Sequence, residues 1–292
     1  MNESSNTNVS PVQPNRTRRW WIALFVLMLA LTAGFLYLRR DDGLQHAVES
    51  RGGQYYAFDS NPFLTRFVVQ FLSRRSTRLH WIFFFDGGVD DQWLIEHAVE
   101  INDRSNLLLT LRDPAVSDAG LAAVTRPDAF MYDLQGSSVT DASLKNLPTS
   151  LQYLNVARTN VTDAGAQQLV SVPSGLTIDG RQFTKDCAST FAARSFFYSL
   201  TILDATDETI EHLSPITVKY ELAIHGSGVT GESLPAFKKM AKPQRLVLIE
   251  VNLTDKELDE LRAHFRGSLV EVTSWSDFEN KTRQSARNSV KR

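Results

Sequence analysis

The chain alternates apolar and polar residues over short runs, and these runs return at a nearly fixed interval. Within each run two apolar residues stand two positions apart, as Leu154 and Val156 do. This period of two is typical of a strand that buries one face. Apolar residues three positions apart follow many of the runs, for example Leu121 and Val124. Their spacing favours a short amphipathic helix after each strand.

The interval can be counted from the apolar residue that precedes each Thr-Asp-like pair. These residues are Val89, Val116, Val139, Val161, Phe183, Ala205, Val229 and Leu253. Successive spacings are 27, 23, 22, 22, 22, 24 and 24 residues. Such regularity predicts about eight degenerate repeats over 79–266, each a strand, a turn, a helix and a return. Because one unit cannot bury its apolar side alone, we expect an α/β solenoid with a concave parallel sheet and short convex helices.

A hydroxyl residue followed by an aspartate recurs where the predicted helices begin. The hydroxyl residues are Ser117, Thr140, Thr162, Thr206 and Thr254, and the aspartates are Asp118, Asp141, Asp163, Asp207 and Asp255. A hydroxyl at this place accepts a hydrogen bond from an otherwise unpaired backbone N–H. An acidic side chain in the first turn meets the positive end of the helix dipole. In the last unit Thr254 and Glu257 also fit a capping box.

These aspartates fall one repeat apart along a rim and do not converge on one point. We therefore interpret them as structural helix caps. A hydrolase or a metal site that uses the aspartate series is the weakest alternative.

An uncharged stretch precedes the repeats at residues 20–38. As a helix rising about 1.5 Å per residue it would span roughly 28 Å, close to the thickness of a bilayer core. We predict a transmembrane anchor over 20–40, after a disordered cytoplasmic tail at 1–19. Basic residues are slightly more numerous before the stretch than after it, so the repeats are expected outside the cytoplasm. A cleaved signal peptide is the alternative.

Segments beside the repeats are expected to cap their open ends. Residues 41–78 contain an expected edge strand, "GGQYY", and an amphipathic run, whereas 267–280 contain an expected final strand. Residues 281–292 carry five basic residues and no acid. That composition indicates a solvated, disordered tail.

At this point the residues resemble a known family. The stretch "LQYLNVARTNVTDAGAQQL" (151–169) resembles leucine-rich repeats of the L-x-x-L-x-L-x-x-T-x-V-T-D-x-G-L kind. Such repeats occur in membrane-anchored bacterial proteins and in eukaryotic ubiquitin-ligase adaptors. The segment "AVESRGGQYYAFD" (47–59) is similar to the helix–Gly-Gly–strand cap that often precedes the bacterial arrays. The resemblance implies protein recognition on the concave sheet, without the adaptor role, because nothing similar to an F-box module precedes the repeats.

If the apolar pair of each strand points inward, the alternate positions face the concave side. The candidate partner-binding residues are then Arg112, Met131, Asp133, Tyr153, Asn155, Phe197, Glu221, His225 and Arg245. Aromatic residues, Met and Arg are enriched at the centres of interfaces. For the run "WIFFF" (81–85) the alternative is a core strand that is buried on both faces.

The sequence contains few other features that indicate catalysis or metal binding. The chain has no G-x-x-x-x-G-K-[ST], H-E-x-x-H or G-x-S-x-G motif. The lone Cys187 stands at a small-residue position and is expected to be buried, and "DGGVDD" (86–91) lacks the ligand spacing of a calcium loop. The net charge of -2 gives no bias toward nucleic acid.

We therefore predict a non-catalytic module, without cofactor or metal, that binds a protein or a component of the cell envelope. The alternative is a structural envelope scaffold without a specific ligand.

Overall fold

In the computed structural model of the chain, the described residues are 28, 43–59, 78–84, 87–104, 106–125, 129–148, 150–169, 174–193 and 196–289. A compact unit over Gln45–Arg292 contains the expected repeats. The predicted tail at 1–19, the predicted anchor except for Met28, and residues 60–77 of the predicted cap lie outside the described residues. Among the residues that are described, no helix is both long and apolar enough to cross a membrane.

Strands and helices alternate along this unit. The strands are β1 (Gln54–Asp59), β2 (Arg78–Phe84), β3 (Leu107–Leu111), β4 (Met131–Asp133), β5 (Tyr153–Asn155), β6 (Gly175–Asp179), β7 (Phe197–Leu203), β8 (Val218–His225), β9 (Arg245–Ile249) and β10 (Leu269–Thr273). The helices are α3 (Asp91–Glu96), α4 (Ala98–Asn102), α5 (Asp118–Val124), α6 (Asp141–Leu144), α7 (Asp163–Gln168), α8 (Lys185–Ala192), α9 (Asp207–Leu213), η2 (Gly231–Ser233), α10 (Leu234–Phe237), α11 (Asp255–His264) and α12 (Trp275–Ser289). A further helix covers residues 43–50.

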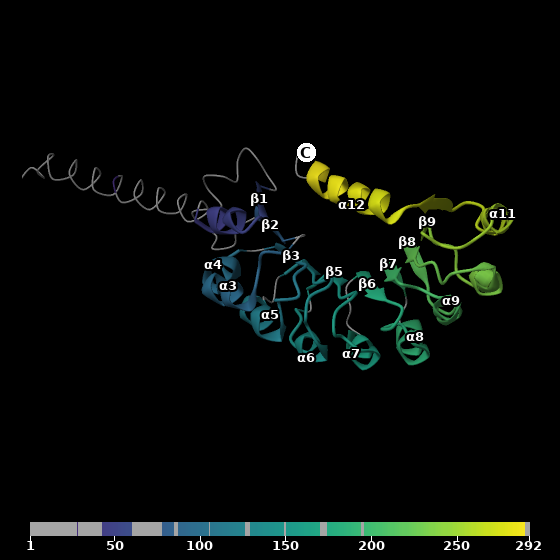
Figure 1. Cartoon of the computed structure of the whole chain (residues 1–292), viewed down its shortest axis with the longest axis horizontal. Helices are drawn as coiled ribbons and strands as arrows, with labels where there is room; N and C mark the ends of the chain where they lie inside the picture. Colours follow the sequence, from purple (N-terminus) through teal and green to yellow (C-terminus); the bar gives the residue numbers. More distant parts are fainter. Residues whose placement is uncertain are drawn as a thin grey trace, which may run out of the picture. The chain divides into compact units, whose positions relative to one another are not determined.

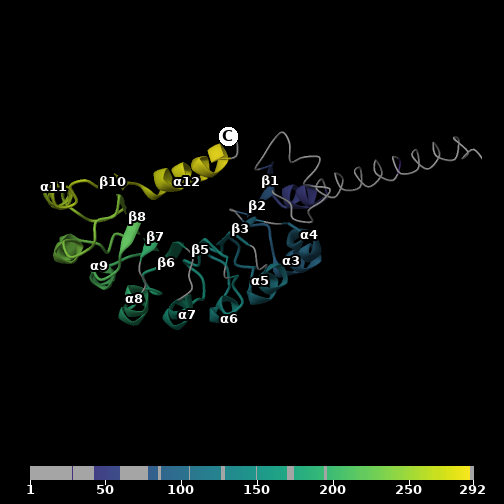
Figure 2. The same ribbon diagram turned by 180° about the vertical axis from the view of Figure 1, so that it is seen from behind.

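The described strands form one ten-stranded sheet whose order follows the sequence from β1 to β10. The edge strand β1 is antiparallel to β2, and the later neighbours are parallel. Helices α5 to α8 lie on one side of this sheet, as Figure 1 shows, and Figure 2 shows the same arrangement from behind. The chain is thus a solenoid-like α/β protein, as the repeat spacing predicts.

Stacked apolar side chains form the core between the sheet and these helices. Tyr132 pairs in register with Leu154, and Leu154 pairs with Leu176 on the next strand. All three side chains are almost fully buried, and so is Val156, two positions after Leu154. The inward strand positions predicted from the period of two are confirmed here. The alternate positions consequently point to the opposite face of the sheet.

Four of the five predicted hydroxyl caps accept a hydrogen bond from an N–H of their own helix: Ser117, Thr140, Thr206 and Thr254. Thr254 and Glu257 form the predicted capping box. Thr162 stands at the N-cap of α7, but its side chain makes no bond to that helix, so the prediction is wrong for this hydroxyl. The Thr162 Oγ1 donates instead to Oδ2 of Asp141, 2.7 Å away in the preceding repeat.

Four of the five predicted aspartates, Asp118, Asp141, Asp163 and Asp207, do more than face a helix dipole, because each of them also binds the next repeat. Asp118 accepts hydrogen bonds from the backbone N of Thr140 at 2.8 Å and from its Oγ1 at 2.6 Å. We call this arrangement an aspartate link. The corresponding pairs are Asp91–Ser117, Asp141–Thr162 and Asp207–Thr230, and Asp163 accepts a hydrogen bond from the Thr184 hydroxyl at the same place in its repeat. Each link fixes where the following helix begins.

At two junctions a capping box replaces the aspartate link. The N-cap residues Thr206 and Thr254 bond there with the third residue of their own helix, and the preceding helices begin with Lys185 and Gly231 instead of aspartate. A Cβ on Gly231 would overlap Oε1 of Glu257. The Glu257 carboxylate therefore fills the space that an aspartate occupies at the other junctions.

Candidate functional site

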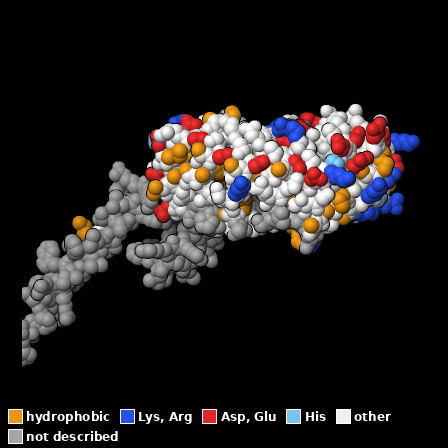
Figure 3. Space-filling view, turned by 90° about the horizontal axis from the view of Figure 1, so that it is seen from below, with side chains coloured by type: hydrophobic (Ala, Val, Ile, Leu, Met, Phe, Trp, Pro, Cys, Tyr) orange, Lys and Arg blue, Asp and Glu red, His pale blue; other side chains and the backbone are white. Residues whose placement is uncertain are grey.

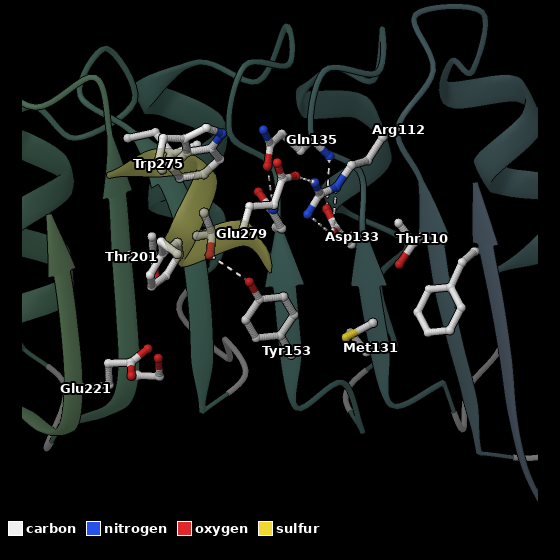
Figure 4. Close-up of a pocket in the computed structure, with 16 residues that line it drawn as sticks. Thr110, Arg112, Met131, Asp133, Gln135, Tyr153, Thr201, Glu221, Trp275 and Glu279 are labelled. Carbon is white, nitrogen blue, oxygen red and sulfur yellow. Dashed lines mark hydrogen bonds and ion pairs between the residues drawn. The ribbon is translucent and has the colours of Figure 1, made fainter. Parts of the chain in front are cut away.

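The alternate strand positions bring side chains from successive repeats to the concave face of the sheet. A hollow of about 280 Å³ lies over this face. Six of the predicted partner-binding residues line it: Arg112, Met131, Asp133, Tyr153, Asn155 and Glu221. Figure 4 labels all of them except Asn155 and shows the labelled side chains above the strands. The strand register places Met131 beside Tyr153 and Asp133 beside Asn155, so residues about one repeat apart become neighbours.

Arg112 joins two carboxylates across this hollow. Its Nε and Nη2 donate to Oδ2 of Asp133, at 3.0 and 2.7 Å. Its Nη1 donates to Oε1 of Glu279, at 2.8 Å. Burial alone lowers the pKa of Arg112, but the ion pairs with Asp133 and Glu279 outweigh burial and raise that pKa above its ordinary value. The guanidinium is therefore a fixed positive charge with little exposure to solvent.

Tyr153 and Asn155 form the floor of the hollow. The Tyr153 hydroxyl and Thr177 Oγ1 are 2.8 Å apart and share a hydrogen bond. Burial, supported by the nearby Asp133 carboxylate, raises the pKa of Tyr153 to about 12, so its hydroxyl keeps its proton at neutral pH. Asn155 Nδ2 donates to Oε1 of Gln135 at 3.2 Å. This floor can both donate and accept hydrogen bonds.

Glu221 and Arg245, predicted to face a partner, form an ion pair with each other. Arg245 Nη2 also donates to Oε2 of Glu271, 2.7 Å away on β10. Glu271 in turn pairs with Lys281 of α12. Hydrogen bonds from Lys281 and Arg245 lower the pKa of Glu271. A row of alternating charges thus crosses β8, β9 and β10 and ends on α12.

His225 lies between two carboxylates at the end of β8. Its Nδ1 is 3.6 Å from Oδ1 of Asp204, and its Nε2 is 3.3 Å from Oε2 of Glu250. The centre of the imidazole lies 5.1 Å from the indole of Trp275. Glu250 Oε1 also accepts a hydrogen bond from the backbone N of Trp275, at 3.1 Å. His225, one of the predicted partner-binding residues, therefore contacts Trp275, the first residue of α12.

Helix α12 crosses the concave face, which the sequence analysis does not predict. Trp275 and Phe278 pack against an apolar patch on the sheet that consists of Ala223, Val247 and Ile249. Figure 1 shows the helix on the side of the strands opposite to α5 to α8, and Figure 4 shows its residues Trp275 and Glu279 over the strands. The helix contributes Trp275, Phe278 and Glu279 to the wall of the hollow.

Residues 281–289, expected to lie in a disordered tail, instead continue α12. The spacing of Trp275 and Phe278 by three, followed directly by Glu279, is the sequence signal that could have revealed an amphipathic helix. The many basic residues after Glu279 suggested a solvated tail, but a helix that lies on a surface can carry them on its exposed side.

Phe197 is not on the concave face, so its assignment as a partner-binding residue is wrong. Its side chain is fully buried and its ring centre lies 5.1 Å from that of Phe191 in α8. The pairing of β7 with β8 shifts between Phe197 and Ser199. This irregularity breaks the alternation of faces and turns Phe197 toward the helices.

The strand β2 is buried on both faces, as the alternative interpretation of 81–85 predicts. Trp81 and Phe83 form a cluster with Leu108 on the concave side, and Tyr56 and Met131 pack against it. On the opposite side Phe84 contacts Trp93 of α3, with 5.1 Å between the ring centres. Phe85 lies outside the described residues. Met131 therefore connects this cluster to the hollow.

The helix-bearing side differs from the concave face. Figure 3, seen from below, shows acidic and basic side chains mixed with scattered apolar ones. Within the described part of the chain, no group of three or more His, Cys, Asp or Glu side chains is arranged to hold a metal ion. Cys187 is buried, and burial raises the pKa of its thiol to about 12. A thiol that keeps its proton is a poor nucleophile.

No protein-family model matches the chain, and no curated protein matches it significantly.

Proposed function

We propose that this chain is a membrane-anchored leucine-rich-repeat protein that binds another protein, or a component of the cell envelope, through its concave sheet. Residues 20–38 supply the anchor, the N-terminus is cytoplasmic, and the repeats lie on the opposite side of the membrane. The recurring Thr-Asp motif and the solenoid-like order of the strands support the leucine-rich-repeat assignment. The module has no chemical activity of its own.

The hollow on the concave face is the observation that carries this proposal. It combines Met131, Tyr153 and Arg112 with the acidic residues Asp133 and Glu279. These apolar, aromatic and basic types are enriched in interface centres, where fixed charges select the partner. The surface is built from several repeats, so it can contact an extended stretch of another molecule.

Site-specific photocrosslinking in the native cells tests the proposal. A photoreactive amino acid is placed at Gln135, which lines the hollow, and in a second variant at Val99, which is 73% exposed on α4. We expect a discrete crosslinked protein from Gln135 and none from Val99. Capture of the same protein from Val99 alone would place the binding surface elsewhere. Full biological function without capture from either position would favour the structural envelope scaffold.

A further inference from the structure

Helix α12 binds the concave face through three side chains of different character. Trp275 and Phe278 cover the apolar patch of Ala223, Val247 and Ile249. Glu279, directly after Phe278, supplies a carboxylate to Arg112. The aromatic residues stand at positions i and i+3 of a helix and the acid at i+4, so all three project from one side of it. The concave face is complementary to this pattern in polarity and charge.

Helix α12 nevertheless buries little of its surface against the sheet. Trp275, Phe278 and Glu279 are each only partly buried, and no described side chain of α12 is fully buried. The hollow of about 280 Å³ remains beneath it. In the preceding strand β10 no side chain is fully buried either, and Leu269 is 60% exposed. A segment with so few buried contacts belongs to the least stable part of a fold.

We propose that the concave face binds an amphipathic helix of a partner protein, with aromatic residues at i and i+3 and an acidic residue at i+4. In this proposal α12 is a resident competitor that occupies the same surface until the partner displaces it. The inference rests on the proposed function and specifies its partner. A partner helix with larger side chains than α12 would also fill the hollow.

Charge complementarity favours a partner helix that carries an acidic residue at this position. Arg112 lies between Asp133, which belongs to the sheet, and Glu279, which belongs to the helix. Withdrawal of α12 removes one of the two carboxylates that Arg112 binds and leaves its ion pair with Asp133 in place. A partner helix with a carboxylate at this place restores the second charge-assisted hydrogen bond of this largely buried guanidinium. A basic or purely apolar helix does not supply that acceptor.

The competition has a measurable consequence. The apparent affinity for a partner falls by the fraction of molecules whose concave face is open. An intramolecular segment has a high effective concentration, so even a weak attachment keeps most of the molecules closed. Weakening α12 should therefore tighten binding in trans without any change in the surface itself.

A synthetic peptide with the sequence of residues 274–289 serves as the probe, and the receptor is the full-length chain in detergent micelles. Peptide binding is followed by fluorescence anisotropy. We expect the variant Trp275→Ala/Phe278→Ala to bind the peptide at least about tenfold more tightly than the unaltered chain, because its concave face is open more often. The matched control Asn280→Ala/Gln284→Ala changes exposed positions of the same helix and should bind like the unaltered chain.

Peptide variants test the required pattern. Peptides that carry Phe278→Ala or Glu279→Lys should bind the released chain roughly tenfold more weakly or worse, which corresponds to the loss of one well-formed anchor. Equal binding of the three peptides would overturn the proposed pattern. If the double variant of the chain does not fold, Glu279→Lys in the full-length chain gives a second release variant, since it reverses only the charge that faces Arg112.

Three results would overturn the inference as a whole. Equal affinity of the peptide for the unaltered and released chains would show that α12 does not compete. A released chain that keeps its unfolding midpoint but binds no peptide would exclude this class of partner. A cellular partner that crosslinks at Gln135 and is not displaced by the peptide would preserve the proposed function and reject only this inference. Peptide binding without any crosslinked cellular partner would count against the proposed function instead.

Discussion

Asp118 accepts two hydrogen bonds from Thr140, one from the backbone N at 2.8 Å and one from Oγ1 at 2.6 Å. The carboxylate that begins one helix thus fixes the start of the helix in the next repeat. Ser143 of that next helix donates a third hydrogen bond to the same carboxylate. An acidic residue that sequence patterns assign to a single helix is in fact a connection between two repeats.

Removing this connection should destabilise the chain. We expect Asp118→Ala to lower the free energy of unfolding by about 2 kcal/mol, because it leaves the Thr140 donors without their charged acceptor. Asp255→Ala is the matched control, since Asp255 holds the same helix position but no aspartate link follows it. That control should lose only about 0.5 kcal/mol, the usual contribution of an acid at a helix start. Urea unfolding of both variants measures the difference, and equal losses would contradict the link.

Asp118 also gives stability a pH dependence. Burial raises the pKa of Asp118, but hydrogen bonds from Ser143 and Thr140 outweigh burial and place the pKa below its ordinary value of 3.8. A carboxyl group whose pKa is lower in the folded state stabilises the fold above its unfolded pKa and loses this contribution as the pH falls through its folded pKa. We therefore expect stability to decline below about pH 4. In Asp118→Asn, urea midpoints measured over the same range should decline less steeply.

Gly231 and Glu257 offer a test of the capping box that replaces a link. Gly231→Asp should destabilise the chain by about 1–3 kcal/mol, because the new side chain enters the space of the Glu257 carboxylate. Adding Glu257→Gly should recover most of the loss, since the new aspartate can then bind Thr254 as Asp141 binds Thr162. Thermal unfolding of the two single variants and the double variant measures the coupling. Additive losses would show that the two residues do not share one space.

Truncation of Phe197 should cost far more stability than truncation of its neighbour Tyr198. Phe197→Ala should lower the free energy of unfolding by about 3–5 kcal/mol, as expected for a large side chain removed from a core. Tyr198 is 50% exposed, and Tyr198→Ala should lower it by less than about 1 kcal/mol. Denaturant unfolding compares the pair. A small decrease in the free energy of unfolding for Phe197→Ala would indicate that Phe197 faces the concave surface.

The sequence is sufficient to predict most of the strand faces, because successive side chains of a strand point to opposite sides of the sheet. Tyr153 and Asn155 lie on the concave side while Leu154 between them is buried. The prediction fails at Phe197 for a local reason. Leu200 pairs with Leu176 and Leu222. Ala205 lies five residues after Leu200, whereas Phe183 and Val229 lie seven residues after Leu176 and Leu222, so the count back from Ala205 is displaced by two residues. The irregular pairing at Phe197 then breaks the period that the prediction relied on.

Two other features have no local signature. The aspartate links join residues in different repeats, and a helix-start pattern carries no information about the neighbouring repeat. The ion pair of Arg112 with Glu279 joins residues 167 positions apart, and periodicity cannot indicate a contact between a repeat and a segment that follows all the repeats. Tertiary packing alone determines both features.

The replacement of links at Thr206 and Thr254 has a mechanical consequence. At these two junctions the N-cap hydroxyl bonds within its own helix. Fewer hydrogen bonds on the helix side therefore cross the boundary between the repeats. In a linear array each boundary resists separation through its own contacts. When the array is pulled from its two ends, we expect the repeats to separate first at these two junctions. A pulling experiment should then release the chain in blocks that end near Thr206 and Thr254, and not one repeat at a time.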